Sequence, residues 1–327
     1  MYDAPMRILV IGGMQFMGRE IVHQLVARGD EVAVLHRRDR HDLGPRVRNI
    51  QADRGDLDTL TRILGQERFD VVVDMVYDWE KGTPPGHVEA AARACGERLH
   101  RYLFMSSIAA YAPGLNRRED DPLAPDDFPI PYSAHKAGSE RALFRLHAES
   151  GFPVTTFRPP YVHGPGQPFY REQFFWDRLL DGRPIILPDG GTTPMQWVYS
   201  KDVAAACVGA LDVPDAAGQA FNVAHEAGTQ RSFVETLARV AGVEPRFAGV
   251  PRAAIQEAGG QLMGGHLYFG EVLDLPPLTE VVEKGPRVLG VTPLPLEDAL
   301  RETFAWYREQ PRRPADYAFE DRLLASA

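Results

Sequence analysis

Short apolar runs alternate with segments of helical periodicity through the first half of the chain. Residues 8–11, 70–75, 101–105 and 153–158 form runs that are too short for helices and are typical of buried strands. Two further strands are expected, one at the end of the segment MRILVIGGMQFMGREIVHQLVARGDEVAVLHRR and one at 47–51. Helical patterns follow the first run, where the apolar positions end at Gly29, and recur at 88–98 and 132–150. Because the crossovers between strands carry helical patterns, the sequence predicts an α/β fold with a doubly wound parallel sheet.

The second half of the chain differs from the first in composition. Segments rich in proline and glycine, such as HGPGQP at 163–168 and LPDGGTTP at 187–194, predict the loops of a smaller, irregular C-terminal lobe. A helix at 202–211 and a strand at 220–224 are expected to return to the main sheet. The predicted domains are 1–165 with 197–225, then 166–196 with 226–315. A polar tail at 316–327 is expected to be loosely held.

A glycine-rich turn joins the first strand to the first helix. Gly12, Gly13 and Gly18 surround this turn. Glycines here let backbone N–H groups approach a pyrophosphate at the N-terminus of the following helix. Gln15 occupies the place of the middle glycine in a G-x-x-G-x-x-G fingerprint, so the motif is incomplete. The alternative is a tight strand-to-helix turn that binds no ligand.

The residues after the second strand distinguish between two nicotinamide cofactors. An acidic residue about twenty positions past the glycines would bind the ribose 2′-hydroxyl of NAD. This chain has His36, Arg37 and Arg38 there, and arginine pairs well with a 2′-phosphate. The sequence therefore favours NADP over NAD, with a solvated basic loop as the alternative. Asp53, after the third strand, is a candidate either for the adenine amino group or for a helix cap.

Composition and charge narrow the function classes. The chain is 44% hydrophobic and 25% charged, as in ordinary globular proteins, and its net charge of −9 argues against a nucleic-acid partner. Cys95 and Cys207 form no motif and are expected as buried thiols in a reducing compartment. The histidines show no metal-ligand spacing, so no metal is expected. No apolar run would span a membrane, and the first strand leaves no room for a signal peptide. We therefore expect a cytoplasmic protein with a small-molecule substrate and no membrane partner.

Tyr132 and Lys136 stand four positions apart at the start of a predicted helix. At this spacing both side chains lie on one helix face, about 5–6 Å apart at Cβ. The cation is expected to lower the pKa of the phenol, so that tyrosine exchanges protons nearer neutral pH. Ser107 directly follows the fifth strand, where residues face the ligand crevice of an open α/β sheet. Each feature alone has a structural explanation, but their order after a nucleotide-binding turn indicates a catalytic set.

A series of sequence blocks extends this pattern. SSIAAY at 106–111 is similar to S-S-x-x-x-Y, and YSAHKAGSE at 132–140 to Y-x-x-S-K-x-x-x-E. FRPPYVHGPGQ, WVYSKDVAAA and AFNVA follow in the same order as related blocks of the extended short-chain dehydrogenase/reductase family, in its NAD(P)-dependent epimerase/dehydratase group. The turn GGMQFMG is closest to the subgroup written G-G-T-x-F-x-G. The resemblance covers about residues 7–224.

This resemblance implies a Rossmann sheet and an NAD(P)-dependent enzyme. Tyr132 would be the acid or base, Lys136 would hold the nicotinamide ribose and Ser107 would bind the same substrate oxygen, while hydride passes between the substrate and cofactor C4. The residues expected around the cofactor are Gly12, Gly13, Gln15, Phe16, Met17, Gly18, His36, Arg37, Arg38, Asp53, Arg54, Met75, Tyr132, Lys136 and Pro159. The residues expected around the substrate are Tyr77, Trp79, Ile108, Tyr161, His163, Arg171 and Trp197.

The chain departs from the family pattern in three places, and the first two departures weaken a nucleotide-sugar assignment. Tyr161 stands where sugar-nucleotide epimerases usually carry asparagine, and Met195 where they place an arginine on the pyrophosphate. MVYDW at 75–79 replaces the usual H-x-A-A after the fourth strand. The substrate is therefore not named by the sequence.

The predicted function is an oxidoreductase or epimerase/dehydratase acting on a hydroxyl or carbonyl of a small substrate, with sugars among the candidates. One alternative is a simple NADPH-dependent ketone or aldehyde reductase. A more distant alternative is a non-catalytic nucleic-acid or regulatory binding protein on the same fold.

The resemblance also implies a homodimer. In the family, the helices corresponding to about 88–98 and 133–150 commonly pair across a two-fold axis. Ala134, Ala137, Ala142 and Leu146 are small and apolar enough for close packing between helices at such an interface.

Overall fold

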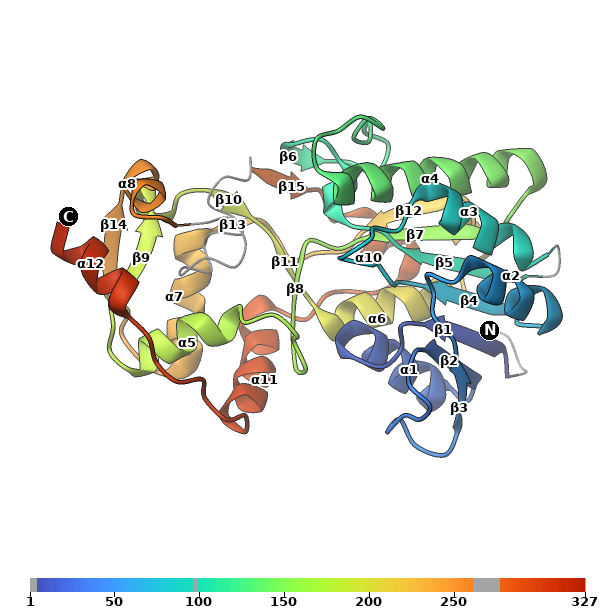
Figure 1. The fold of residues 1–327 in the computed structure, drawn as a ribbon, viewed down its shortest axis with the longest axis horizontal. Helices are drawn as coiled ribbons and strands as arrows, with labels where there is room; N and C mark the ends of the chain where they lie inside the picture. Colours follow the sequence, from blue (N-terminus) through green and yellow to red (C-terminus); the bar gives the residue numbers. More distant parts are fainter. Residues whose placement is uncertain (1–4, 97–98, 261–276, 327) are drawn as a thin grey trace.

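The computed structural model describes residues 5–96, 99–260 and 277–326 (Figure 1). Its centre is a seven-stranded sheet with the strand order β12-β7-β5-β4-β1-β2-β3, in which every neighbouring pair is parallel. The strands are β1 (Arg7–Ile11), β2 (Glu31–His36), β3 (Val47–Gln51), β4 (Val71–Asp74), β5 (Arg101–Met105), β7 (Val154–Arg158) and β12 (Gln219–Asn222). The chain builds the sheet outward from β1 in one direction and then from β4 in the other. The predicted doubly wound Rossmann sheet is therefore confirmed.

Helices cover both faces of this sheet, which explains why its central strands are almost wholly apolar. α1 (Phe16–Arg28) and α6 (Ser200–Gly209) pack together on one face. α2 (Leu57–Gln66), α3 (Pro85–Ala94) and α4 (Pro131–Ser150) lie together on the other face (Figure 1).

Helix ends follow local chemistry. α1 ends at Gly29 and α4 at Gly151, both in the left-handed conformation that favours glycine. α3 begins at Pro85, where a proline in the first helical turn loses no hydrogen bond, and so starts earlier than the predicted 88. It also ends at Ala94, earlier than predicted.

The second lobe has a hydrophobic core of its own, around Trp176, Leu187, Phe233, Leu237 and Leu300. Its short strands pair two by two, so its regular elements are joined by the proline- and glycine-rich segments. The elements between the lobes and within the second lobe are β8 (Tyr161–His163), α5 (Glu172–Leu180), β9 (Ile185–Pro188), η2 (Asp189–Gly191), β10 (Pro194–Met195), β11 (Trp197–Tyr199), η3 (Pro214–Ala216), β13 (Gly228–Thr229), α7 (Gln230–Ala241), β14 (Phe247–Val250), α8 (Arg252–Glu257) and α11 (Leu296–Arg308).

One late segment returns to the first lobe. β15 (Leu278–Glu280) pairs with β6 (Gly114–Arg117), and both lie above the main sheet in Figure 1. α10 (Lys284–Leu289) then contacts β12 and α6. Residues from well beyond the family blocks thus help to close the first lobe.

The end of the chain differs from the prediction of a loosely held tail. It forms α12 (Ala318–Ser326), in which Phe319 and Leu323 are buried against the second lobe. Glu320 pairs with Arg178 at 2.5 Å. The prediction of a loosely held tail is wrong. It relied on the overall polarity of the segment and overlooked Phe319 and Leu323, which stand four positions apart on one helix face.

Candidate active site and cofactor cleft

The glycine turn brings its backbone close together in front of α1. Gly12 has φ +97°, and a Cβ at Gly18 would lie 2.3 Å from the Gly12 carbonyl oxygen. Gln15, Phe16 and Met17 complete the turn into the helix N-terminus. This cradle without side chains is what a pyrophosphate requires, so the turn fits a dinucleotide.

A hollow of about 770 Å³ lies beside this turn. It is lined by Met14, Gln15, Arg19, Arg37, Arg38, Asp39, Arg40, His41, Asp42 and Gln51. His36 directly precedes Arg37 in the sequence, and burial lowers the pKa of its imidazole. The arginines that were predicted to choose the cofactor therefore face a cavity, although Asp39 and Asp42 share it and Arg19 pairs with Asp42.

Asp53 and Arg54 are neighbours in the sequence, but the Asp53 side chain is exposed and the Arg54 side chain is buried. Asp53 is exposed, and its carboxylate accepts the Gly55 N–H at 2.8 Å. The helix cap considered for Asp53 is Asp56 instead, which accepts the Thr59 N–H. Arg54 turns inward and donates to both carboxylate oxygens of Asp74.

Asp74 is a site residue that the sequence interpretation missed. It ends β4, is 1% exposed, and also accepts a hydrogen bond from the Tyr102 hydroxyl at 2.9 Å. The available signal was a single carboxylate inside the apolar run 71–75. Its charge acts on Lys136 and raises the pKa of that amine against the effect of burial.

The predicted catalytic set is brought together at the start of α4. Lys136 is buried, and its amine donates to the Met105 carbonyl at 2.6 Å and lies 5.8 Å from the centre of the Tyr132 ring. The Ser107 oxygen accepts the Ala109 N–H and so caps η1 (Ile108–Ala110). A hydrogen bond with Ser107 also lowers the pKa of Tyr132. Ser107 is therefore both a cap and a partner of the phenol.

The protonation states differ from the prediction. Burial is the main effect on Tyr132 and raises the pKa of its phenol, against the smaller effects of Ser107 and Arg171. Burial also lowers the pKa of Lys136 to about 8. The expected lowering of the tyrosine pKa by the lysine is wrong here, because the amine is directed at the Met105 carbonyl and desolvation dominates. At neutral pH the phenol holds its proton and can donate it.

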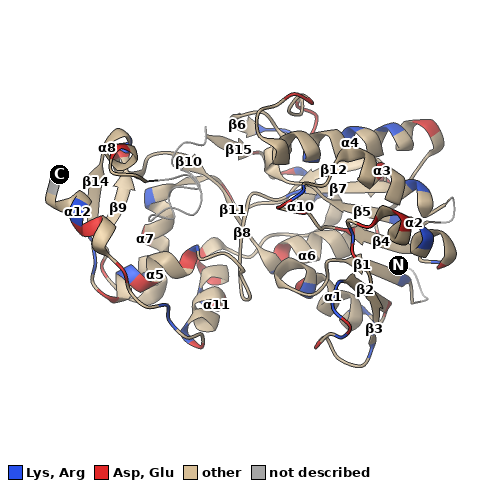
Figure 2. Cartoon of the chain, viewed as in Figure 1, with Lys and Arg blue, Asp and Glu red and all other residues tan. Residues whose placement is uncertain are grey.

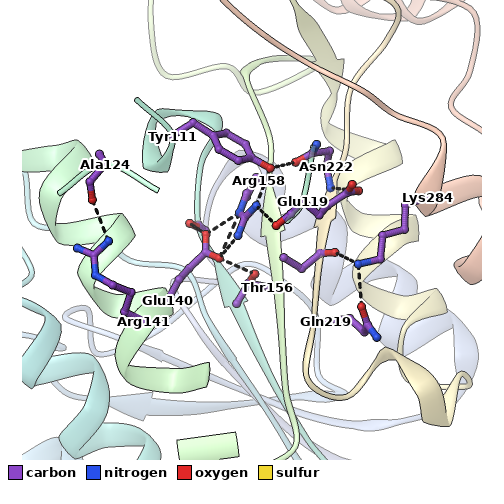
Figure 3. Close-up of polar contacts among 12 residues, drawn as sticks. Tyr111, Glu119, Ala124, Glu140, Arg141, Thr156, Arg158, Gln219, Asn222 and Lys284 are labelled. Atoms are coloured by element: carbon purple, nitrogen blue, oxygen red, sulfur yellow. Dashed lines mark hydrogen bonds and ion pairs between the residues drawn. The ribbon is translucent and has the colours of Figure 1, made fainter. Parts of the chain in front are cut away.

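A buried polar network fixes the backbone beneath this set (Figure 3). Arg158 donates from Nε and Nη2 to Glu140, one helical turn after Lys136, at 2.6–3.2 Å. Arg158 also donates to the Tyr111 hydroxyl, which donates to Asn222 at 2.8 Å. Ser106, next to Ser107, donates to Glu140 as well. The network thus joins α4 to the ends of β5, β7 and β12.

Aromatic side chains pack against Tyr132. Trp79 stacks on the Tyr132 ring with centroids 4.9 Å apart, and Tyr77 meets it edge-on at 4.8 Å. Met75 lies next to Gly12, where an added Cβ would meet its side chain at 3.2 Å. Ile108 donates its N–H to the Pro159 carbonyl, which places both residues beside Ser107.

Tyr161, at the start of β8, lies beside Arg171, which belongs to the second lobe. The Arg171 guanidinium lies 5.1 Å from the Tyr161 ring and 5.0 Å from the Phe169 ring. Its charge acts on the Tyr132 phenol, so this group lies close to the catalytic set.

Two predicted substrate residues point elsewhere. His163 is fully buried and contacts His225, with 3.2 Å between the two Nε2 atoms, and Thr303. Trp197 stacks on Phe233 at 3.9 Å within the core of the second lobe. The sequence interpretation missed His135, whose Nδ1 lies 3.1 Å from the Tyr77 hydroxyl.

Within residues 5–96, 99–260 and 277–326, no group of three or more His, Cys, Asp or Glu side chains is arranged to hold a metal ion. Among the helices of these ranges, none combines the length and apolarity needed to cross a membrane.

The fold and this cleft define a nicotinamide-dinucleotide enzyme of the extended short-chain dehydrogenase/reductase type. Residues 8–224 match the model of the NAD dependent epimerase/dehydratase family, and the chain belongs to that family. The family resemblance predicted from the sequence blocks is therefore confirmed.

Individual relatives differ in what their names describe. The chain is 27% identical to chloroplast stem-loop binding protein of 41 kDa b of Arabidopsis thaliana, over 98% of this chain and 84% of that protein. It is 26% identical to a dTDP-glucose 4,6-dehydratase of an Actinoplanes species, over 93% of this chain and 98% of that one. A similar fold is found in UDP-glucuronic acid 4-epimerase from Bacillus cereus in complex with UDP-glucuronic acid and NAD, with a TM-score of 0.72, 18% identity, and coverage of 93% and 99%.

Proposed function

We propose that the protein is an NAD(P)-dependent oxidoreductase or epimerase/dehydratase that acts on a hydroxyl or carbonyl of a small substrate. The observation that carries this proposal is the grouping of Tyr132 with Ser107 and the buried Lys136 at the start of α4, in a chain whose first strand ends in a glycine turn that fits a pyrophosphate. Residues 1–165 with 197–225 would hold the cofactor. Residues 166–196 and 226–315 would form the substrate lobe, of which 261–276 lie outside the described residues.

The residues of the chain would act as follows. Ser107 and Tyr132 bind the substrate oxygen, and Tyr132 donates its proton to that oxygen in reduction or accepts it in oxidation. Lys136 orients the nicotinamide ribose, and the backbone of the glycine turn binds the pyrophosphate. The cofactor, when bound, supplies or accepts the hydride.

The same cleft supports a preference for NADP. Arg37 and Arg38 line the hollow beside the glycine turn, where the 2′-phosphate of NADP would lie. Asp39 and Asp42 also line this hollow, and the negative charge of Asp42 is offset by its ion pair with Arg19.

The simple reductase is a second candidate, and the protonation of Tyr132 favours it. Burial raises the pKa of this phenol, so the protein without ligands holds a proton donor ready for a carbonyl oxygen. An epimerase or dehydratase regenerates its cofactor within each cycle, whereas a reductase consumes one NAD(P)H for each product. Cofactor that remains bound and unchanged after turnover would favour an epimerase or dehydratase. Oxidation of one NAD(P)H for each product formed would favour a reductase.

A nucleic-acid-binding role is favoured by one observation, the name of the Arabidopsis relative. The chain has a net charge of −9, and Figure 2 shows basic and acidic residues interspersed over both lobes. Phosphate backbones bind clustered positive charge, so this distribution favours the enzyme.

The test of the proposed function is the substitution Tyr132→Phe. It keeps the ring that Trp79 covers and removes the proton, so turnover should fall by about 100-fold or more while cofactor affinity stays the same. Steady-state rates with NADPH and a panel of sugar nucleotides and simple ketones measure turnover, and titration with the cofactor measures its affinity. Near-normal turnover in this variant would rule out Tyr132 as the acid/base.

A further inference from the structure

Asp177 on α5 accepts hydrogen bonds from α11, from the residues after α11 and from the loop before α5. Its carboxylate is 6% exposed. It accepts the Tyr307 hydroxyl at 2.6 Å and the Arg312 Nε–H at 2.9 Å. It also accepts the hydroxyl of Tyr170, a residue of the loop that leads into α5. Tyr170 and Arg312 therefore share one buried anion, and hydrogen bonds to an ionised group are stronger than neutral ones.

Arg312 and Arg313 hold Tyr170 through its hydroxyl and through its ring. The Arg313 guanidinium lies 4.2 Å from the centre of the Tyr170 ring, within the range of a cation–π interaction. Arg312 donates from Nη2 to the Asp177 carbonyl and to the Asp181 carboxylate, at 2.9 Å in each case. The hydroxyl of Tyr170 is thus fixed through Asp177, and its ring lies against the next arginine of the chain.

The helix that ends the chain anchors these two arginines. They stand near the start of residues 310–326, which we call the C-terminal strap. Further along the strap, Tyr317 donates its hydroxyl to Asp181 at 2.6 Å, and Phe319 and Leu323 of α12 are buried in the core of the second lobe. The strap is therefore held against the second lobe by both polar and apolar contacts, which keep its arginines at Tyr170.

The loop that contains Tyr170 reaches from the cofactor turn to the catalytic set. Residues 164–171, the cleft loop, join β8 to α5 between the two lobes (Figure 1). Near one end, a Cβ added to Gly166 would lie 3.9 Å from the N and Cα atoms of Phe16 in the glycine turn. At the other end, the charge of Arg171 acts on the Tyr132 phenol. Tyr170, next to Arg171, is where the C-terminal strap holds this loop.

We propose that the C-terminal strap positions the cleft loop against the glycine turn, so that the loop is already ordered when the dinucleotide binds. Arg312 and Arg313 are positioning residues in this arrangement, because they act through Tyr170. A loop that is mobile in the free protein loses conformational entropy when it closes on a ligand, and this loss weakens binding. The strap reduces that loss in advance. The effect on cofactor binding rests on the proposed function, whereas the contact between strap and loop does not.

Hydrogen exchange of the protein without ligands tests the contact itself. Arg312→Ala removes the bonds to Asp177 and Asp181 and should make the amides of the cleft loop exchange about tenfold faster. Arg312→Lys keeps the charge and should have a smaller effect. Arg308→Ala removes an exposed arginine of α11 and is the matched control, which should leave the loop unchanged.

The amides of β5 report unfolding of the whole protein and should exchange at the wild-type rate in each variant. If they also exchange faster in Arg312→Ala, Tyr170→Phe decides, because it removes a single hydroxyl and should still speed exchange in the cleft loop. A cleft loop that exchanges at the wild-type rate in Arg312→Ala would overturn the inference.

Titration with NADPH separates this inference from the proposed function. Arg312→Ala should bind NADPH about tenfold more weakly than the wild type, and Arg308→Ala should bind it equally well. Faster exchange of the cleft loop with unchanged NADPH affinity would overturn the positioning role. A wild-type protein that binds neither NADPH nor NADH would contradict the proposed function, and the exchange rates would then decide the contact between strap and loop by themselves.

Discussion

Arg54 and Asp74 form a two-point ion pair inside the protein, with Nε–Oδ1 and Nη2–Oδ2 distances of 3.2 and 2.7 Å. The side chains are 5% and 1% exposed. Arg54 follows β3 and Asp74 ends β4, and β1 and β2 lie between these strands in the sheet. The pair thus connects the two halves of the doubly wound sheet at the edge where the cofactor is expected.

The substitution Asp74→Ala should destabilise the protein by about 3–5 kcal/mol, because it leaves the Arg54 charge buried without its partner. Urea unfolding followed by circular dichroism would measure the loss. The double variant Arg54→Met with Asp74→Leu removes both charges and should recover most of the stability. A double variant as unstable as the single one would contradict the ion-pair account.

Lys136→Met should abolish turnover and yet stabilise the protein. Burial of the amine lowers its pKa from 10.5 to about 8, so the charged form is unfavourable in the folded state at neutral pH. Removing it should add about 1–2 kcal/mol at pH 7, after subtraction of the lost hydrogen bond to Met105. Unfolding free energies of both proteins at pH 7 test this expectation, and a less stable variant would contradict it.

The pH dependence of that difference has a definite sign. Between about pH 8 and 10.5 the unfolded chain binds a proton on Lys136 that the folded protein does not. The stability of the wild type should therefore rise with pH across this window relative to Lys136→Met, and the gap should be constant below pH 8. Comparison of the two proteins cancels the other groups that titrate there. A gap that does not change between pH 8 and 10.5 would show that the amine is not the cause.

Arg37→Ser with Arg38→Ser should remove most of the preference for NADP. A charge-assisted pair with the 2′-phosphate contributes about 1.5–3 kcal/mol, or a tenfold to hundredfold preference, and NAD lacks that phosphate. Titration of both proteins with both cofactors measures the change. Arg46→Ser, an exposed arginine outside the hollow, serves as the control. Equal binding of NAD and NADP by the wild type would mean that the arginines are only a solvated loop.

The homodimer remains a proposal, but its predicted contacts need correction. Ala137, Ala142 and Leu146 are buried within the chain itself, so they cannot face a second copy. The outer face of α3 and α4 instead carries ion pairs among Glu89, Arg93, Arg145 and Glu149.

If the two copies meet through α3 and α4, as the family resemblance implies, these charges lie in the interface. Analytical ultracentrifugation should then find a dimer at micromolar concentration, and Arg145→Glu should shift it towards monomer by repulsion from Glu89 and Glu149. A wild-type protein that is monomeric at that concentration would refute the dimer.

The sequence by itself determined the elements with strong local signals. The run at 101–105 became β5 with the same bounds and is fully buried, because a central parallel strand is covered on both faces and needs an almost continuous apolar sequence. Residues 47–51 also became a strand with the predicted bounds, β3, which lies at the edge of the sheet. Gly12 and Gly18 marked the nucleotide turn, since only glycine allows that close approach of the backbone. The spacing of Tyr132 and Lys136 placed both at the start of one helix.

The tertiary structure decided what depends on groups distant in sequence. The raised pKa of Tyr132 follows from desolvation of its phenol in the folded chain, and no local sequence pattern contains that desolvation. Arg54 turned from the expected cofactor site to Asp74, twenty residues further along the chain, because a buried arginine requires a carboxylate. His163 and Trp197 looked like pocket residues and are buried by His225 and Phe233, which approach them only when the chain folds. Burial and charge pairing are properties of the folded neighbourhood, and for this reason the sequence alone could not assign them.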